Sequence, residues 1–243
     1  MENTSVSEKS IKKENPFINL IANIFLPVVI LNKSELFPTE HGSIIALCVA
    51  LSFPVGYGLW DWFKNSRKNY LSLLGVVNTL ITGVFALYKL SGDWFAIKEA
   101  AFPAVLGLAV YISSYVKRPL LKTMLMASGL LKYDQIEEGA KNTTSLKDLD
   151  KVFIKCNSLF SLSFFVSAAL NFFLALYIFS PLPNTMSEEA KSNALNGQIS
   201  QMTWMGMLVI GLPMFIFLGV TFYIFFKDLK KVTGLNEDEI LST

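Results

Sequence analysis

Charged residues, histidine and cysteine are all scarce in this chain of 243 residues. Asp, Glu, Lys and Arg together make up 16% of the sequence, whereas a soluble domain carries about a quarter. His41 is the only histidine, and the two cysteines, Cys48 and Cys156, lack the spacing of metal ligands or of a disulfide framework. The sequence has no Ser–His or Cys–His set and no glycine-rich phosphate loop. We therefore expect no catalytic residue, no cofactor and no metal site.

Long apolar runs dominate instead. Hydrophobic residues make up 52% of the chain, and its mean hydropathy is +0.45. A transmembrane helix needs roughly 20 apolar residues, and six runs meet or approach this length: 16–31, 43–60, 70–90, 94–115, 157–179 and 202–226. They predict an all-α, polytopic membrane protein with six transmembrane helices. The first 15 residues are polar and the first run lacks a small-residue cleavage site, so we expect no cleaved signal peptide.

Basic residues are distributed unevenly between the two sides of these helices. Seventeen of the 21 Lys and Arg residues fall in the two tails and in the second and fourth loops. Because Lys and Arg concentrate in cytoplasmic loops, both termini should be cytoplasmic. The chain then divides into a cytoplasmic tail (1–15), membrane helices (16–116), a cytoplasmic arm (117–155), membrane helices (156–226) and a cytoplasmic tail (227–243). The arm mixes acids with its bases, so we expect no nucleic-acid partner.

The arm has helical patterns of its own. Leucines and methionines at 120, 121, 124, 125, 130 and 131 are expected mostly on one side of a helix, with Lys and Arg around them. A short helix in the membrane interface fits this pattern, and a solvated linker with an amphipathic turn is the alternative. Ser145 and Asp148 have the spacing of a capping box, which predicts that the fifth membrane helix extends into the cytoplasm.

Proline recurs in the three predicted helices that run from outside to inside. Phe53–Leu59 and Phe102–Leu108 share Phe, Pro, Gly and Leu at matching positions. Pro54, Pro103 and Pro213 therefore suggest helix kinks and a two-helix hairpin used three times, and many transporters are built from such repeats.

The helices that run from inside to outside carry amides instead, at Asn23, Asn78 and Asn171. An unpaired amide in hydrocarbon costs several kcal/mol, so each must find a partner. Two interpretations remain open: the amides join neighbouring helices, or they line a polar cavity near the midplane.

Lys98 and Glu99 interrupt the apolar run 94–115 near its beginning. Ionisable residues inside a membrane are functional candidates. Trp94 belongs at the interface, and from there Lys98 can extend its ammonium outward. Adjacent residues point about 100° apart on a helix, so we expect the two side chains to face different neighbours. Glu99 is either a structural partner of a donor in an external loop or a proton-relay or substrate carboxylate.

Short motifs along nearly the whole chain resemble an uncharacterised family of bacterial inner-membrane proteins. These motifs are Asn15–Pro16, Leu26–Pro27, Leu31–Lys33, Phe53–Tyr57, Trp94–Ala100 and Arg118–Leu120. Residues 94–180 are more distantly similar to the intracellular septation protein A family, through Arg118–Pro119, Phe164–Phe165 and Ala169–Asn171. The resemblance implies a bacterial inner-membrane protein linked to envelope synthesis or division, with no active site to carry over. The chain departs from the septation family by an extra span and a longer cytoplasmic loop.

Two functions follow as expectations. The first is a non-enzymatic, septation-associated membrane component that acts in the bilayer through membrane-protein partners or as a homo-oligomer. The alternative is a small secondary transporter, whose solute path would use Glu99, Asn78 and Asn171. An enzyme acting on lipid would need a nucleophile or metal set that the sequence does not offer.

Overall fold

The computed structural model describes residues 21–33, 36–39, 41–64, 70–116 and 118–242. Within these residues the regular secondary structure is all helical, without a strand, and a single antiparallel bridge joins Leu131 to Leu241. The all-α class is therefore confirmed. The chain forms two compact units: unit 1 holds the described residues up to Leu87 together with Ser187–Ser200, and unit 2 holds Tyr88–Met186 and the described residues from Gln201 onward.

Four helices in the described residues are long and apolar enough to cross a membrane: Gly42–Trp60, Gly92–Tyr115, Leu146–Ile178 and Glu188–Thr233. They contain the predicted runs 43–60, 94–115 and 202–226 and nearly all of 157–179. Gly75–Leu87, within the run 70–90, is a further apolar helical segment. The run 16–31 begins outside the described residues. The helices are those of a membrane protein, but six spans remain a prediction.

Unit 1 is built from η1 (Ile21–Phe25), α2 (Leu26–Leu31), α3 (Gly42–Lys64), α4 (Tyr70–Leu87) and the first part of α9 (Glu188–Met205). The predicted run 202–226 covers only the later part of a longer helix. The helix begins at Glu188 and continues through η3 (Gly206–Gly211) into α10 (Leu212–Thr233).

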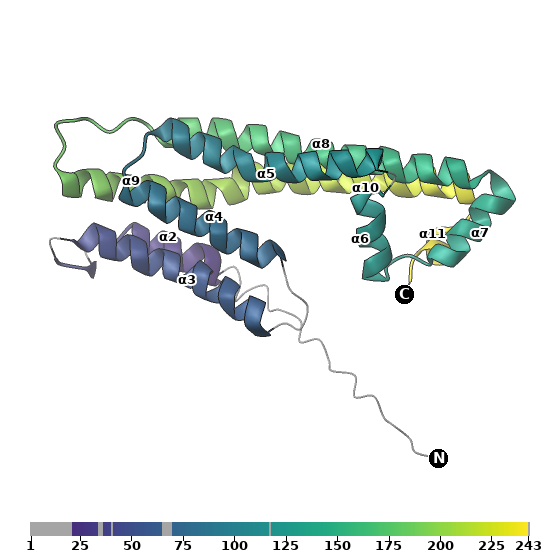
Figure 1. Ribbon diagram of the computed structural model, residues 1–243, viewed down its shortest axis with the longest axis horizontal. Coiled ribbons are helices and arrows are strands. Elements are labelled where there is room, and N and C mark those ends of the chain that lie inside the picture. Colours follow the sequence, from purple (N-terminus) through teal and green to yellow (C-terminus); the bar gives the residue numbers. More distant parts are fainter. Residues whose placement is uncertain (1–20, 34–35, 40, 65–69, 117, 243) are drawn as a thin grey trace, which may run out of the picture. The chain divides into compact units, whose positions relative to one another are not determined.

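Unit 2 contains three long helices that lie side by side (Figure 1): α5 (Gly92–Tyr115), α8 (Leu146–Ile178) and α10. α5 runs antiparallel to α8, because Phe95 stacks on Phe179 at one end while Ser161 bonds to Gly107 farther along. The two backbones approach closely at Gly92, where an added Cβ would lie 1.9 Å from the carbonyl oxygen of Phe179. No side chain larger than hydrogen fits there.

α8 begins where the sequence predicts. Ser145 is its N-cap and accepts a hydrogen bond from the backbone N–H of Asp148 at 3.2 Å. Its 33 residues span about 50 Å at 1.5 Å per residue, whereas the hydrocarbon core of a bilayer is about 30 Å thick. About 20 Å of α8, roughly two fifths of its length, therefore extends beyond a membrane that its apolar part would cross.

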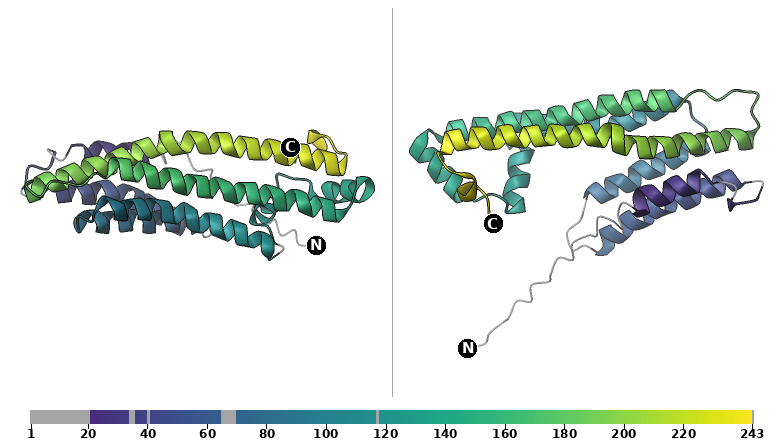
Figure 2. Two further views of the ribbon diagram at one scale, coloured as in Figure 1. Left: turned by 90° about the horizontal axis from the view of Figure 1, so that it is seen from above. Right: turned by 180° about the vertical axis from the view of Figure 1, so that it is seen from behind.

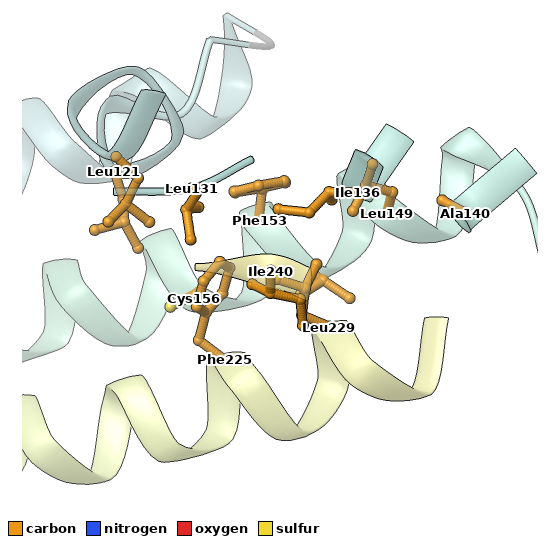
Figure 3. Packing of buried hydrophobic residues seen from close by; sticks show 12 residues of the cluster. Leu121, Leu131, Ile136, Ala140, Leu149, Phe153, Cys156, Phe225, Leu229 and Ile240 are labelled. Atoms are coloured by element: carbon orange, nitrogen blue, oxygen red, sulfur yellow. The ribbon is translucent and has the colours of Figure 1, made fainter. Parts of the chain in front are cut away.

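A hydrophobic core lies at one end of unit 2. It joins α6 (Leu120–Ser128), α7 (Tyr133–Thr143) and α11 (Glu237–Ile240) to the beginning of α8 and the end of α10, and we call this region the cap. Figure 3 shows its side chains converging, with Phe225 and Leu229 of α10 among them. The predicted arm 117–155 and tail 227–243 thus share one core. Figure 2 shows α6 crossing the direction of the three long helices.

The apolar residues of the arm divide between two surfaces. Leu121, Leu125 and Leu131 are buried in the cap core, whereas Leu120, Met124 and Leu130 are exposed. Leu130 and Leu131 lie outside the helix that holds the other four, because Gly129, with φ of +67°, ends α6 and redirects the chain.

The predicted kink prolines lie within or beside helices. Pro54 is inside α3 and Pro103 is buried inside α5. Pro213 stands in the first turn of α10, directly after the π-helical turns of η3, where its missing N–H is tolerated. The repeated hairpin remains a prediction.

Candidate functional site

Lys98 and Glu99 form an ion pair in the second turn of α5. Lys98 Nζ lies 2.6 Å from Glu99 Oε1, and the two side chains are 6% and 18% exposed. The expectation that they would face different neighbours is wrong for this contact. The four-carbon stem of lysine is long enough to turn the ammonium back toward the next residue. The pair carries no net charge, which lowers the cost of placing it in an apolar environment.

Aromatic packing holds this end of α5 in place. The ring of Phe95 is fully buried and stacks on Phe179, with centroids 4.2 Å apart and planes 13° from parallel. Ala96 is also fully buried. The ion pair therefore sits on a helix end that is fixed by side chains on both α5 and α8.

Asn157 on α8 is the centre of a second buried polar cluster, which the sequence interpretation missed. Its amide donates to the carbonyl oxygen of Val110 at 2.7 Å and to the hydroxyls of Ser114 at 2.7 Å and Ser113 at 3.1 Å. Its Oδ1 accepts from the backbone N–H of Leu121 at 3.0 Å. Asn157 is fully buried. We call these contacts the junction cluster, because they join the end of α5 to the beginning of α6.

Ser113 and Ser161 make further hydrogen bonds in the junction cluster. Ser113 Oγ donates to the carbonyl of Val110 at 2.5 Å and accepts from the N–H of Leu120 at 3.0 Å. Ser161, one turn beyond Asn157, donates to the carbonyl of Gly107 at 2.9 Å. The sequence signal was a polar pair, Ser113–Ser114, at the end of one apolar run and an asparagine at the start of another.

The face that α5 buries between the ion pair and the junction cluster is apolar. On α5 the buried residues between Lys98 and Ser113 are Pro103, Gly107 and Val110. The two polar positions are 15 residues apart, which corresponds to about 22 Å along the helix. An added Cβ on Gly107 would lie 3.1 Å from the Cβ of Phe164, so α5 and α8 pack closely there. The described interior of unit 2 therefore has no continuous line of polar side chains along α5.

The predicted amides are divided between the two units. Asn171, half-buried on α8, donates to the carbonyl oxygen and hydroxyl of Ser167 in its own helix, at 2.8 and 3.3 Å. Asn78, on α4, and Asn23, in η1, are both half-buried in unit 1. Within unit 2, Lys98 and Glu99 are the candidate residues that contact each other. Asn171 has a partner within its own turn.

Unit 1 contains a polar interface of its own, which the sequence interpretation also missed. Asn196 of α9 donates to the carbonyl oxygen of Ser43 at 2.8 Å, and Ser43 Oγ donates to Oδ1 of Asn193 at 2.6 Å. Asn32 donates to Ser200 Oγ at 2.8 Å. Asn193, Asn196 and Ser200 recur at helical spacing, so they share a face of α9. These contacts explain why the polar residues of α9 continue as helix.

The cap has a groove on its surface with a volume of about 340 Å³. α8 and α10 form its sides, and its lining residues are Thr144, Asp148, Lys151, Val152, Lys155, Asp228, Lys231 and Val232. Lys155 pairs with Asp228 across the groove at 2.6 Å, and Thr144 Oγ1 donates to the carbonyl oxygen of Val232 at 2.9 Å. We call it the cap groove. It combines ammonium groups, carboxylates and an apolar floor.

Elsewhere in the cap, Lys122 is held by an acid and two aromatic rings. Its ammonium lies 3.0 Å from Asp150 Oδ1 and 5.4 and 5.2 Å from the ring centroids of Tyr133 and Phe153. Burial works to lower the pKa of Lys122, but hydrogen bonds and charge from Tyr133 and Asp150 outweigh it and raise that pKa. Lys122 is therefore protonated at any physiological pH and serves the cap as a fixed cation.

Comparison with known proteins gives no further guide to this chain, since no family model, no curated protein and no solved structure matches it.

Proposed function

We propose that this chain is a non-enzymatic integral protein of a bacterial inner membrane that acts in envelope synthesis or septation. Its apolar helices hold it in the bilayer, and its cap is presented on the cytoplasmic side to partner proteins or to further copies of the chain. The observation that carries the proposal is the apolar buried face of α5 between the Lys98–Glu99 pair and the junction cluster. Polar groups that bond to one another at separate ends of a helix favour a role in helix packing over a role in a solute path.

The cap supports this proposal because it is a folded surface and not a loose loop. Ile136 and Ala140 of α7 are fully buried in its core, while Asp134, Gln135 and Glu138 of the same helix are exposed. We call these three residues the partner face. Because one face of α7 is packed into the core, little conformational entropy is lost when a partner binds the exposed face, and this favours specific association.

The second candidate is a small secondary transporter. One observation favours it: the Lys98–Glu99 pair lies inside a helix long and apolar enough to span a membrane, where ionisable residues commonly mark ion or substrate pathways. In that case the pair itself, and not the cap, would carry the activity.

Complementation in the parent bacterium separates these functions. Cells depleted of the protein would receive either Asp134→Lys with Glu138→Lys, which reverses charge on the partner face, or Lys98→Met with Glu99→Leu, which removes the ion pair. If the cap acts through partners, the first variant should reach the membrane at normal levels but leave cells long and poorly septated, while the second should restore normal septation. The opposite pattern would reject this proposal in favour of transport.

A further inference from the structure

We propose that the cap groove binds a phosphate-bearing anion through Lys151 and Lys231. The groove is lined by three lysines and two aspartates, so its lining carries a net positive charge. Its volume of about 340 Å³ falls within the usual range of small-ligand sites, roughly 300–1,000 Å³.

The ion pairs in the groove determine which cations can take a ligand. Lys155 is held by Asp228 at 2.6 Å, a contact that ties α8 to α10. Lys151 contacts Asp148 at 2.8 Å, but its side chain is 77% exposed, and such a surface pair is worth little. Lys231 is exposed and makes no ion pair with any acid of the described chain. Lys151 and Lys231 are therefore the ammonium groups that an incoming anion can engage.

The position of the groove along α8 indicates the source of that phosphate. Lys155 and Lys151 precede Asn157, where the apolar run of α8 begins, by two and six residues. These offsets correspond to about 3 and 9 Å along the helix. A membrane that covers the apolar run would place its headgroups beside these lysines. Basic pockets between membrane helices on the cytoplasmic side bind anionic lipid headgroups. An anionic phospholipid headgroup is thus the expected ligand, and a soluble phosphate compound shares the same chemistry.

The apolar floor of the groove fits such a ligand. Val152 is buried and Val232 half-buried between the charged side chains. The glycerol and first methylenes of a lipid could cover these valines while its phosphate meets the lysines. This inference relies on the proposed membrane placement, but its test uses purified protein and is independent of septation.

The test measures ligand binding to the full-length protein in maltoside micelles. Three probes would be titrated separately: dihexanoyl phosphatidylglycerol, dihexanoyl phosphatidylcholine and inorganic pyrophosphate, with Kd read from the rise in unfolding temperature. Removing one interfacial lysine should weaken anion binding about fivefold, and removing two about thirtyfold. We expect Lys231→Gln to show the smaller loss and Lys231→Gln with Lys151→Gln the larger one. The control is Lys141→Gln, since Lys141 is also an exposed cap lysine but lies outside the groove.

Each outcome decides the inference. Binding of phosphatidylglycerol alone supports a lipid headgroup, and binding of pyrophosphate supports a soluble phosphate ligand, provided that the double variant loses it and Lys141→Gln keeps it. The unliganded variants should unfold at the wild-type temperature because the substituted lysines are exposed. The inference is overturned if no anion binds, or if the double variant binds as tightly as Lys141→Gln.

Discussion

The amide of Asn157 on α8 donates a hydrogen bond to the carbonyl oxygen of Val110 on α5 at 2.7 Å, and its oxygen accepts from the N–H of Leu121 at the start of α6. One side chain thus fixes the point at which the chain leaves a long apolar helix and enters the cap. In a buried position each of these bonds is expensive to leave unmade.

Replacing Asn157 with alanine should destabilise the protein by about 2 kcal/mol or more, because the buried N–H of Leu121 loses its acceptor and the carbonyl oxygen of Val110 loses a donor. The measurement is equilibrium unfolding in mixed micelles, together with proteolysis between α5 and α7. Asn171→Ala is the matched control, since Asn171 bonds only to Ser167 in its own helix. Equal losses for the two variants would contradict a special role for the junction cluster.

The Lys98–Glu99 pair should behave as a structural unit. Breaking a buried pair by removing one partner typically costs about 3–5 kcal/mol, whereas replacing both with apolar residues is often neutral. Lys98→Met and Glu99→Leu should therefore each lower the unfolding temperature, and the double variant should recover most of the loss. If the double variant is as unstable as the worse single variant, the pair does not act as a mutually compensating unit.

Phe153 is central to the cap core, where it is fully buried and its ring lies 5.5 Å from that of Phe225. Phe153→Ala should cost about 3–5 kcal/mol and expose α6 and α7 to protease. Phe173 is 66% exposed, so Phe173→Ala serves as the control and should leave the cap protected. A cap that stayed resistant without Phe153 would show that this core does not hold it together.

In unit 1, Asn196→Ala should free the beginning of α9 from α3. The variant loses the bond to the carbonyl oxygen of Ser43 and leaves a buried acceptor, at a cost of about 1–3 kcal/mol. Faster hydrogen exchange in Glu188–Ser200 would be the direct readout. Ser192→Ala is the control, because the Ser192 hydroxyl bonds only to Glu188 in its own helix. Unchanged exchange in Asn196→Ala would contradict the role assigned to this contact.

The sequence predicted the parts of the fold that depend on local patterns. Apolar runs located α3, α5, α8 and α10, and the spacing of Ser145 and Asp148 located the beginning of α8. These features depend on residues close together in the chain, so a single sequence is enough to find them.

Features that depend on distant partners were not predicted. Asn157 binds residues 36 to 47 positions away, and Thr143 ties α7 to Thr233, 90 positions away. The helical start of α9 was missed because its residues are polar and its stabilising contacts come from α2, α3 and the loop between them. The Lys98–Glu99 contact depends on a side-chain rotamer, which helix geometry alone does not fix.

Thiol accessibility distinguishes polar residues that are packed within these helices from polar residues that are hydrated. Cys48 and Cys156 would be changed to alanine, since buried Cys156 should not be replaced by a hydroxyl. Single cysteines at Asn78, Glu99 and Asn171 would then be exposed in intact cells to a membrane-impermeant maleimide, with labelling in SDS as the reactivity control. If these polar residues are packed, positions 78 and 171 should stay unlabelled, whether or not position 99 reacts near the helix end. Labelling at both 78 and 171 would mean that water reaches the midplane, and it would contradict the account in favour of a transport path.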